Sequence, residues 1–414
     1  MTINILEKIR DAHYFQLSSQ GNVYTLTNLK LANGTNKILA ATLKREVYCF
    51  EYPENLTDLL IPTTKEVLFT YIPGVAEIIS IDAFNKSDTE NDFVIGITIT
   101  KGGNEQSREN YLNIYSAWEA SQDFNLESIS QNCLNVELSF IPYHLYHTKL
   151  LTWDEQGSIK TEIVWMLSGS DEKVHIYREY RVNHSYKEID LKECFPEFLN
   201  PPSIVMWMDI QYCANNTKRI STYGCECGYV YMAVVDLKSV EILQTYSTRY
   251  ENTITCVQIF SNDVNINNSL CRAIQTTTVD NYQLLVTNTI LPSVVFLNIL
   301  ENGFSEVQVL EGSNYFNVTT CACIADIDLD GENEILIGSY GKEMLAYKYL
   351  KPDGWQLEGI KSFANPLYAM SYVDVTGDGL RELIVLTLRG VHVIQHEPDD
   401  VLEKLESKLK LLNT

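Results

Sequence analysis

The sequence predicts an all-β protein, a seven-bladed β-propeller with a short C-terminal helix. Three observations lead to this prediction. Short apolar runs of four to six residues, rich in Val, Ile, Tyr and Phe, recur along the 414 residues and are typical of strands. Each such run is followed by a polar or glycine break and then by a second run. Two acidic, glycine-containing loops of the same spacing precede two of these pairs.

The paired runs give the number of blades. The first runs begin near residues 38, 93, 163, 219, 284, 335 and 383. Seven units over 414 residues give 414/7, or about 59 residues each, which suits four strands and their turns. We therefore assign residues 1–396 to one propeller. We also expect a strand from one chain end to complete a blade begun by the other, because closure removes sheet edges. The pattern leaves open whether residues 1–14 provide that strand.

Another strand precedes several of the breaks, and it ends in Asp. This form occurs at Asp82, Asp209, Asp326 and Asp374. In the second and fourth units we expect the Asp to begin a longer polar loop without the acidic spacing. Residues 133–140 alternate between apolar and polar side chains, which indicates a strand with one buried face.

The last segment, residues 397–414, breaks the strand pattern. After Pro398, Asp399 and Asp400 can cap a helix. Its apolar positions form an amphipathic stripe of Val401, Leu402, Leu405, Leu409 and Leu412. Two interpretations stay open. The stripe docks a partner, since a helix this short is only marginally stable alone, or it lies against the propeller's own surface.

The two acidic loops are the candidate metal sites. Oxygen side chains occupy positions 1, 3, 5 and 9 of each loop, and position 6 is Gly, where the chain turns sharply. An EF-hand would need flanking helices and a Glu at position 12, whereas strand-like runs flank these loops. The spacing resembles the FG-GAP repeat of integrin-like propellers. The residues are Asp326, Asp328, Asp330, Glu332 and Glu334 in the first loop, and Asp374, Thr376, Asp378 and Glu382 in the second.

Calcium is the ion that such loops would prefer, because hard oxygen ligands at this density suit Ca²⁺. The first loop holds five carboxylates in nine residues, and these repel one another unless a cation or water screens them. The second loop has three carboxylates and the Thr376 hydroxyl, so we expect a weaker site there. The alternative is that both loops are solvated turns. No cofactor is required, and a bound Ca²⁺ would staple strands rather than catalyse.

Composition narrows the class of protein and of partner. The net charge of −23 argues against nucleic acid, because phosphate binding needs a cationic face. No run of 18 apolar residues is present, so we expect no transmembrane segment. Residues 1–14 lack the apolar core of a signal peptide, and most of the ten Cys lie within strand-like runs. We therefore expect a cytoplasmic location.

A catalytic site is not expected. The sequence has no nucleophile elbow, phosphate-binding Gly loop or zincin helix. The closely spaced Cys and His pairs lack the spacing or the acidic partners of metal or acid–base sites; they are Cys225/Cys227, Cys321/Cys323, His144/His147 and His392/His396. A calcium-dependent propeller enzyme and an extracellular adhesion module are the disfavoured alternatives to a protein–protein interaction scaffold.

A more specific resemblance is carried by several segments. Residues 15–24, 39–44, 81–87, 112–115, 126–135 and 195–198 are similar to members of the kaptin family, as are both acidic loops. The similarity extends over residues 15–396 and is weakest in long loops such as 101–110 and 261–280.

The resemblance implies a function that composition does not. Kaptin proteins are propellers described as actin-associated and as subunits of KICSTOR. That complex recruits a Rag-directed GTPase-activating complex to the lysosome and restrains TOR signalling in nutrient shortage. The resemblance thus implies protein partners, among them a second FG-GAP propeller and other KICSTOR subunits, and a peripheral lysosomal location through them. Actin binding in actin-rich structures is the alternative.

Overall fold

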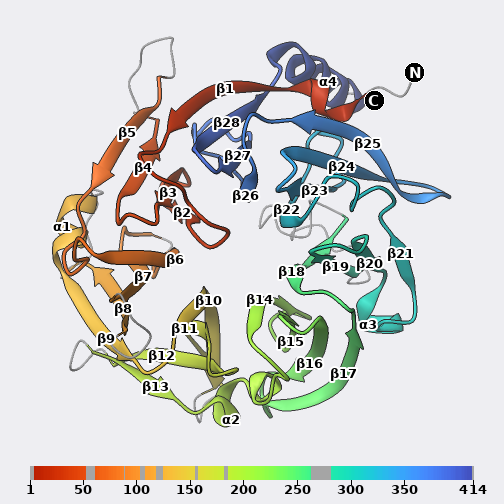
Figure 1. Ribbon diagram of the computed structural model, residues 1–414. Coiled ribbons are helices and arrows are strands. Elements are labelled where there is room, and N and C mark those ends of the chain that lie inside the picture. Colours follow the sequence, from red (N-terminus) through yellow and green to blue (C-terminus); the bar gives the residue numbers. More distant parts are fainter. Residues whose placement is uncertain are drawn as a thin grey trace.

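Seven four-stranded antiparallel sheets are arranged as the blades of a closed ring (Figure 1). The computed structural model describes residues 4–52, 61–87, 89–102, 108–117, 125–153, 157–180, 185–262 and 281–412. The seven-bladed all-β fold predicted from the sequence is confirmed. None of the helices in these ranges is long and apolar enough to cross a membrane.

The first four blades follow the chain in order. The first blade contains β2 (Leu26–Lys30), β3 (Asn36–Ala41), β4 (Val47–Glu51) and β5 (Thr63–Val67). The second contains β6 (Ala76–Asn85), β7 (Phe93–Lys101), β8 (Glu109–Ser116) and β9 (Cys133–Leu138). The third contains β10 (Pro142–Trp153), β11 (Ile159–Gly169), β12 (Val174–Tyr180) and β13 (Ser185–Ile189). The fourth contains β14 (Val205–Cys213), β15 (Lys218–Cys225), β16 (Tyr229–Asp236) and β17 (Glu241–Arg249).

The last three blades complete the ring. The fifth contains β18 (Ile254–Ser261), β19 (Tyr282–Asn288), β20 (Val294–Phe296) and β21 (Val307–Val309). The sixth contains β22 (Thr319–Ala325), β23 (Glu334–Ser339), β24 (Glu343–Leu350) and β25 (Gly354–Ser362). The seventh combines β26 (Leu367–Val373), β27 (Glu382–Thr387) and β28 (Gly390–His396) with β1 (Ile9–Gln16). The short helices are η1 (Ile5–Lys8), α1 (Leu126–Gln131), α2 (Leu191–Cys194), η4 (Pro196–Phe198) and α3 (Ile299–Asn302).

The seven predicted first runs all lie in the second strand of a blade, namely β3, β7, β11, β15, β19, β23 and β27. This strand pairs on both edges and packs on both faces against neighbouring blades. In β7, for example, every residue except the last is buried. Most of these strands therefore contain apolar runs, which is why they are the clearest signal in the sequence, although β15 also includes the buried polar residues Arg219, Ser221 and Thr222.

The ring is closed by its N-terminal strand. β1 runs antiparallel to β28, from the pair Ile9–His396 to the pair Gln16–Gly390 (Figure 1). The strand therefore supplies the outer edge of a blade whose other three strands lie at the C-terminal end. This answers the question that the sequence pattern left open. Pairing of the two chain ends couples the first and last blades and removes a free sheet edge.

Two strands are longer than predicted. β6 continues past Asp82 to Asn85, and β14 continues past Asp209 to Cys213, so neither Asp begins a loop. The strands extend because the residues that follow are packed. Phe84 and Ile210 are buried between blades.

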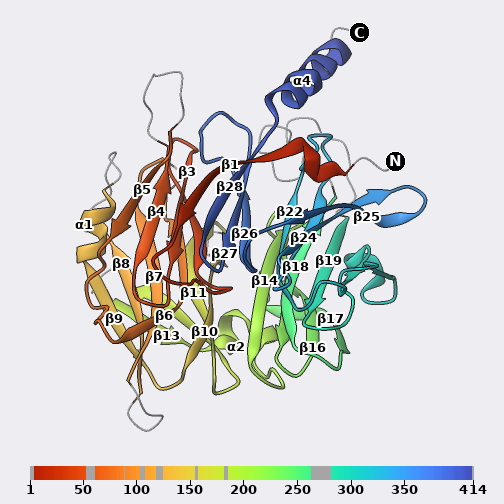
Figure 2. The same ribbon diagram turned by 45° about the horizontal axis from the view of Figure 1, so that its top comes forward.

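The predicted C-terminal helix is present as α4 (Pro398–Leu412) and projects away from the ring (Figure 2). Leu402 is 56% exposed and Leu405 is 53% exposed. These two side chains therefore do not lie against the propeller, in contrast to one of the two interpretations of the stripe. The side chains of Leu409 and Leu412 lie outside the described part of the structure.

Candidate functional site

The first acidic loop joins β22 to β23 and is folded by its own backbone. The Asp326 carboxylate accepts the N–H groups of Asp330 and Gly331, each at 3.1 Å. Glu334 Oε2 accepts the N–H of Ile327 at 2.8 Å. Gly331 has φ 96°, a conformation in which Gly costs least. These contacts turn the chain so that the side chains of Asp326, Asp328 and Glu334 converge.

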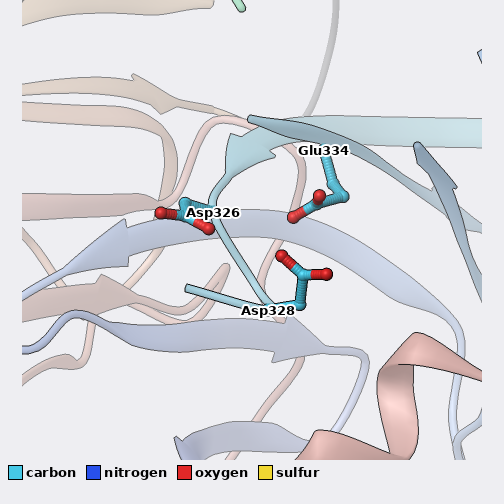
Figure 3. Close-up of side chains that lie close together, drawn as sticks. All are labelled: Asp326, Asp328 and Glu334. Carbon is cyan, nitrogen blue, oxygen red and sulfur yellow. The ribbon is translucent and has the colours of Figure 1, made fainter. Parts of the chain in front are cut away.

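Three carboxylates converge as a result. Oxygen atoms of Asp326, Asp328 and Glu334 all lie within 4.8 Å of one another (Figure 3). Glu334 is fully buried, and the Asp328 side chain is 10% exposed. Carboxylates this close and this poorly hydrated repel strongly, so the cluster needs a proton or a cation.

The cation in the structure is a lysine that the loop pattern did not include. Lys348, in β24, places its Nζ 2.7 Å from Asp328 Oδ2, 2.5 Å from Asp330 Oδ2 and 3.0 Å from Glu334 Oε1. Lys8, from η1, adds a longer contact of 3.7 Å to Asp328 Oδ2. The Lys348 ammonium thus holds three carboxylates of the loop at once.

The pKa shifts reflect this crowding. Burial, with a further contribution from Asp328, raises the pKa of Glu334 to about 7. Burial alone would lower the pKa of Lys348, but its hydrogen bonds to the carboxylates raise it well above the usual range. Lys348 is therefore charged at neutral pH. One ammonium does not neutralise three carboxylates, and Glu334 is the acid that retains a proton most readily.

The predicted calcium ligands of this loop are only partly brought together. Asp326, Asp328 and Glu334 form the cluster, whereas Asp330 joins it through Lys348. Glu332 contributes its N–H, which Asp330 Oδ1 accepts at 2.8 Å. A calcium ion at the cluster would have to displace the Lys348 ammonium. Oδ1 of Asp328 is buried without a hydrogen-bond partner, so this cluster retains acceptor capacity.

The second acidic loop, between β26 and β27, has the same backbone scheme without a lysine. The Asp374 carboxylate accepts the N–H groups of Gly377 at 2.7 Å and Gly379 at 3.0 Å. Glu382 accepts the N–H of Val375 at 2.9 Å and the Thr376 hydroxyl at 3.0 Å. The Asp378 carboxylate accepts the N–H of Leu380. Within the described ranges, no Lys, Arg or His forms an ion pair with these acids.

Burial raises the pKa of Glu382 to about 7, as it does for Glu334. In the second loop, however, no ammonium opposes the shift. The predicted ligands Asp374, Thr376, Asp378 and Glu382 are held mainly by hydrogen bonds within the loop. Calcium binding at either loop stays a prediction.

The two Asp residues that lie inside strands connect neighbouring blades. Asp82, in the second blade, accepts the Thr27 hydroxyl from the first at 3.2 Å and contacts His147 Nδ1 in the third at 2.7 Å. Asp209, in the fourth blade, accepts the Ile259 N–H of the fifth at 2.7 Å. Asp82 and Asp209 therefore connect adjacent blades through hydrogen bonds.

A further ionic contact is fully buried at the entry to the fourth blade. Glu197 Oε1 accepts Arg219 Nε at 2.8 Å and the Ser221 hydroxyl at 2.7 Å. The Arg219 guanidinium stacks over the Phe195 ring, with its Cζ 4.0 Å from the ring centroid. The segment Phe195–Phe198, one of those that carried the family resemblance, is thus an anchor between blades. Sequence reasoning missed this role, although a Glu between two aromatic residues was its signal.

The imidazoles near the centre of the ring are also engaged in packing. His144 is buried, accepts the Met208 N–H through Nδ1 at 3.3 Å and stacks on Trp207. Burial lowers its pKa to about 4, so it is neutral. His147 lies with Asp82 beside a cavity of about 1020 Å³ that extends over the first four blades. Its contact with Asp82 is the arrangement closest to an acid–base pair at this cavity.

Comparison with known proteins gives two kinds of similarity. The family model described as KICSTOR complex protein kaptin matches residues 9–406. A mouse (Mus musculus) protein named KICSTOR complex protein kaptin is 40% identical over 402 residues, which cover 96% of this chain and 90% of that protein. Among solved structures, BBS1N in complex with ARL6DN aligns with a TM-score of 0.54 at 9% identity, over 94% of this chain and 97% of that one. The Dos1 propeller aligns with a TM-score of 0.52 at 8% identity, over 94% and 96%. The structural similarities concern the fold alone.

Proposed function

Because this chain belongs to the kaptin family, we propose that it is a non-catalytic scaffold subunit of a KICSTOR-like complex. In this role it pairs with a second FG-GAP propeller at the lysosomal surface. The assembly recruits a Rag-directed GTPase-activating complex, and it restrains TOR signalling when amino acids or glucose are scarce.

One observation supports a scaffold over an enzyme: the buried polar side chains form hydrogen bonds within the propeller. The groups that acid–base chemistry would require are engaged between blades or strands. Asp209 accepts two backbone N–H groups, His144 accepts one, and His392 Nδ1 contacts Asp11 of the closing strand at 2.6 Å. Groups whose hydrogen bonds are spent on holding the ring are poorly placed to exchange protons with a substrate.

Removal of the protein from cells tests the proposal. Without it, we expect phosphorylation of TOR substrates to stay high after amino-acid withdrawal. Re-expression of the full chain should restore the fall. Normal inhibition in cells lacking the protein, together with no propeller subunit in the purified complex, would contradict the scaffold role. Actin association would then be the leading alternative, to be tested by co-sedimentation with filaments.

A second arm of the same experiment separates a scaffold from an enzyme. His147→Gln removes the imidazole beside the large cavity and keeps a side chain that can donate to Asp82. A scaffold carrying this substitution should restore starvation sensitivity to the level of the parent. A variant that folds, joins the complex and fails to restore it would indicate chemistry at this cavity.

A further inference from the structure

The connector between the first and second blades, residues 68–75, displays apolar side chains to solvent. It joins β5 to β6. Phe69 and Ile72 point inward and are 8% and 7% exposed, within the core between the two blades. Leu68, Tyr71 and Val75 point outward and are 74%, 67% and 73% exposed. Three large apolar side chains this exposed on one short segment form the kind of patch that binds partners.

This connector is held in place by the second blade. The Thr70 N–H donates to Ser130 O at 3.1 Å, and Tyr115 Oη donates to Thr70 O at 2.5 Å. Asn113 Nδ2 donates to Tyr71 O at 3.2 Å, and Gln131 Nε2 donates to Leu68 O at 3.3 Å. The outward side chains are therefore presented from a fixed backbone, so less conformational entropy is lost when a partner binds.

Tyr71 adopts a conformation that an aromatic residue rarely occupies. Its φ is 61°, in the left-handed region where Gly or Asn is usual. Strain of this kind costs about 1–3 kcal/mol and clusters at functional positions. Hydrogen bonds to the carbonyls of Thr70 and Tyr71 hold this conformation. They direct the Tyr71 ring, which is 67% exposed, to the surface where a partner can contact it.

A depression of about 790 Å³ lies next to the patch, between the seventh, first and second blades. Val75 forms part of its wall, together with Leu17, Leu43 and Leu388. Basic side chains surround it. Lys44 and Arg389 are part of its lining, and Arg45 lies against Gly74. None of the three bases forms an ion pair with an acid in the described part of the chain.

This depression is less acidic than the chain as a whole. Two bases and two acids, Glu46 and Glu77, line it, and a third base, Arg45, lies against Gly74 of the lining, whereas acids exceed bases by 23 over the whole sequence. Tyr and Arg are also the residue types that contribute most energy at protein interfaces. The concave shape fits inserted side chains better than it fits the flat surface of a bilayer.

We propose that Leu68, Tyr71 and Val75, with the adjoining depression, dock a partner protein segment that carries apolar side chains flanked by carboxylates. The inference rests on the proposed scaffold function and names the surface through which one partner is held. Apolar side chains of the partner cover the patch, and its carboxylates meet Lys44, Arg45 and Arg389.

The test uses the full chain co-expressed with each of the other KICSTOR subunits in turn. Tyr71→Asn removes the ring and suits the left-handed backbone. We expect its melting temperature to equal or exceed that of the parent while its affinity for one subunit falls at least tenfold. A second variant, Lys44→Glu with Arg389→Glu, should lower the affinity for the same subunit and make that affinity less dependent on salt concentration.

A matched control comes from Ile290, which is 62% exposed in the turn between β19 and β20. Ile290→Ser should change no affinity. The docking surface is refuted if Tyr71→Asn binds every subunit as the parent does. If the parent itself binds no subunit, the scaffold function fails before this surface is tested. Loss of sedimentation with phosphatidylserine vesicles, with all subunit binding retained, would replace the protein partner by a lipid surface.

Discussion

The two acidic loops share one backbone design and differ in charge balance. In both, the first Asp accepts N–H groups of the turn, and the Glu at position 9 accepts the N–H of the residue after that Asp. Lys348, one residue beyond the ladder pair Ile335–Tyr347, donates to Glu334 at 3.0 Å, and the position equivalent to Lys348 beyond the pair Leu383–Ile394 is Gln395. A lysine therefore offsets part of the charge of the first loop, whereas the equivalent position for the second loop is a neutral amide. The comparison teaches that the loop pattern fixes the turn, whereas the opposite strand decides how its charge is balanced.

Removal of Lys348 should have the largest effect. Lys348→Met leaves Asp328, Asp330 and Glu334 without their ammonium, and losing one partner of a buried ionic cluster costs about 3–5 kcal/mol. Urea denaturation at pH 8 measures the loss. Gln395→Met is the matched control in the second loop, where we expect a change below about 0.5 kcal/mol. Equal losses in the two variants would show that Lys348 does not balance the first loop.

Titration of the second loop should come next. The pKa of Glu382 is about 7 in the folded protein and 4.5 ordinarily, so its contribution is fully present below pH 4.5 and is lost as pH rises through 7. Glu382→Gln should therefore reduce the fall in the free energy of unfolding between pH 5 and pH 8, by about 2 kcal/mol. Glu334→Gln should raise the free energy of unfolding at pH 8 by less than Glu382→Gln does, because it also weakens a contact with Lys348. An unchanged pH slope in Glu382→Gln would contradict the raised pKa.

Calcium binding at the first loop should change the stability by a smaller amount than these substitutions do. In the parent, the ion must compete with Lys348 at the first loop, so we expect this loop to contribute little to any change in thermal stability on chelation. In Lys348→Met the cluster is free, and calcium at ten times its Kd would restore about 1.4 kcal/mol. Asp328→Ala in the Lys348→Met background should abolish that gain. A parent stabilised by calcium as much as Lys348→Met would show that the ammonium is not a competitor.

The smallest expected effect concerns one hydroxyl. Thr376→Val removes the hydrogen bond to Glu382 Oε1 and leaves that buried oxygen with one donor fewer, at a cost of about 1 kcal/mol. The loss should be greater at pH 8 than at pH 5, because the ionised carboxylate needs the donor more. A loss independent of pH would mean that the hydroxyl acts through packing alone.

The blade count could be predicted because the second strands are mostly buried and contain recurring runs rich in apolar residues. Residues such as Phe93–Ile97 are buried by both neighbouring strands and both neighbouring blades, so their local pattern carries the fold. The acidic turns could be predicted for a similar reason. Gly331 and the ligand spacing act within nine residues.

Closure by a strand from one chain end was predicted, but the local pattern could not show whether the N-terminal residues supply that strand. β1 is only partly apolar, with buried Ile9 followed by mostly exposed or half-buried residues, because its outer edge and outer face meet solvent. Its partner β28 is nearly the whole chain away, and only the curvature of seven blades brings the two ends together.

The charge balance of the candidate site was likewise decided by tertiary structure. In the sequence, Lys348 is a single base in a mostly apolar run. No local pattern indicates that it contacts acids 14–20 residues earlier. By itself, the sequence determined seven strand-rich units, two acidic turns and a C-terminal helix, since each depends on side chains close together in the chain. The tertiary structure decided which ends meet, which cation fills the first turn and which apolar side chains of α4 and the 68–75 connector face solvent. Those outcomes depend on distances between residues that only the closed ring sets.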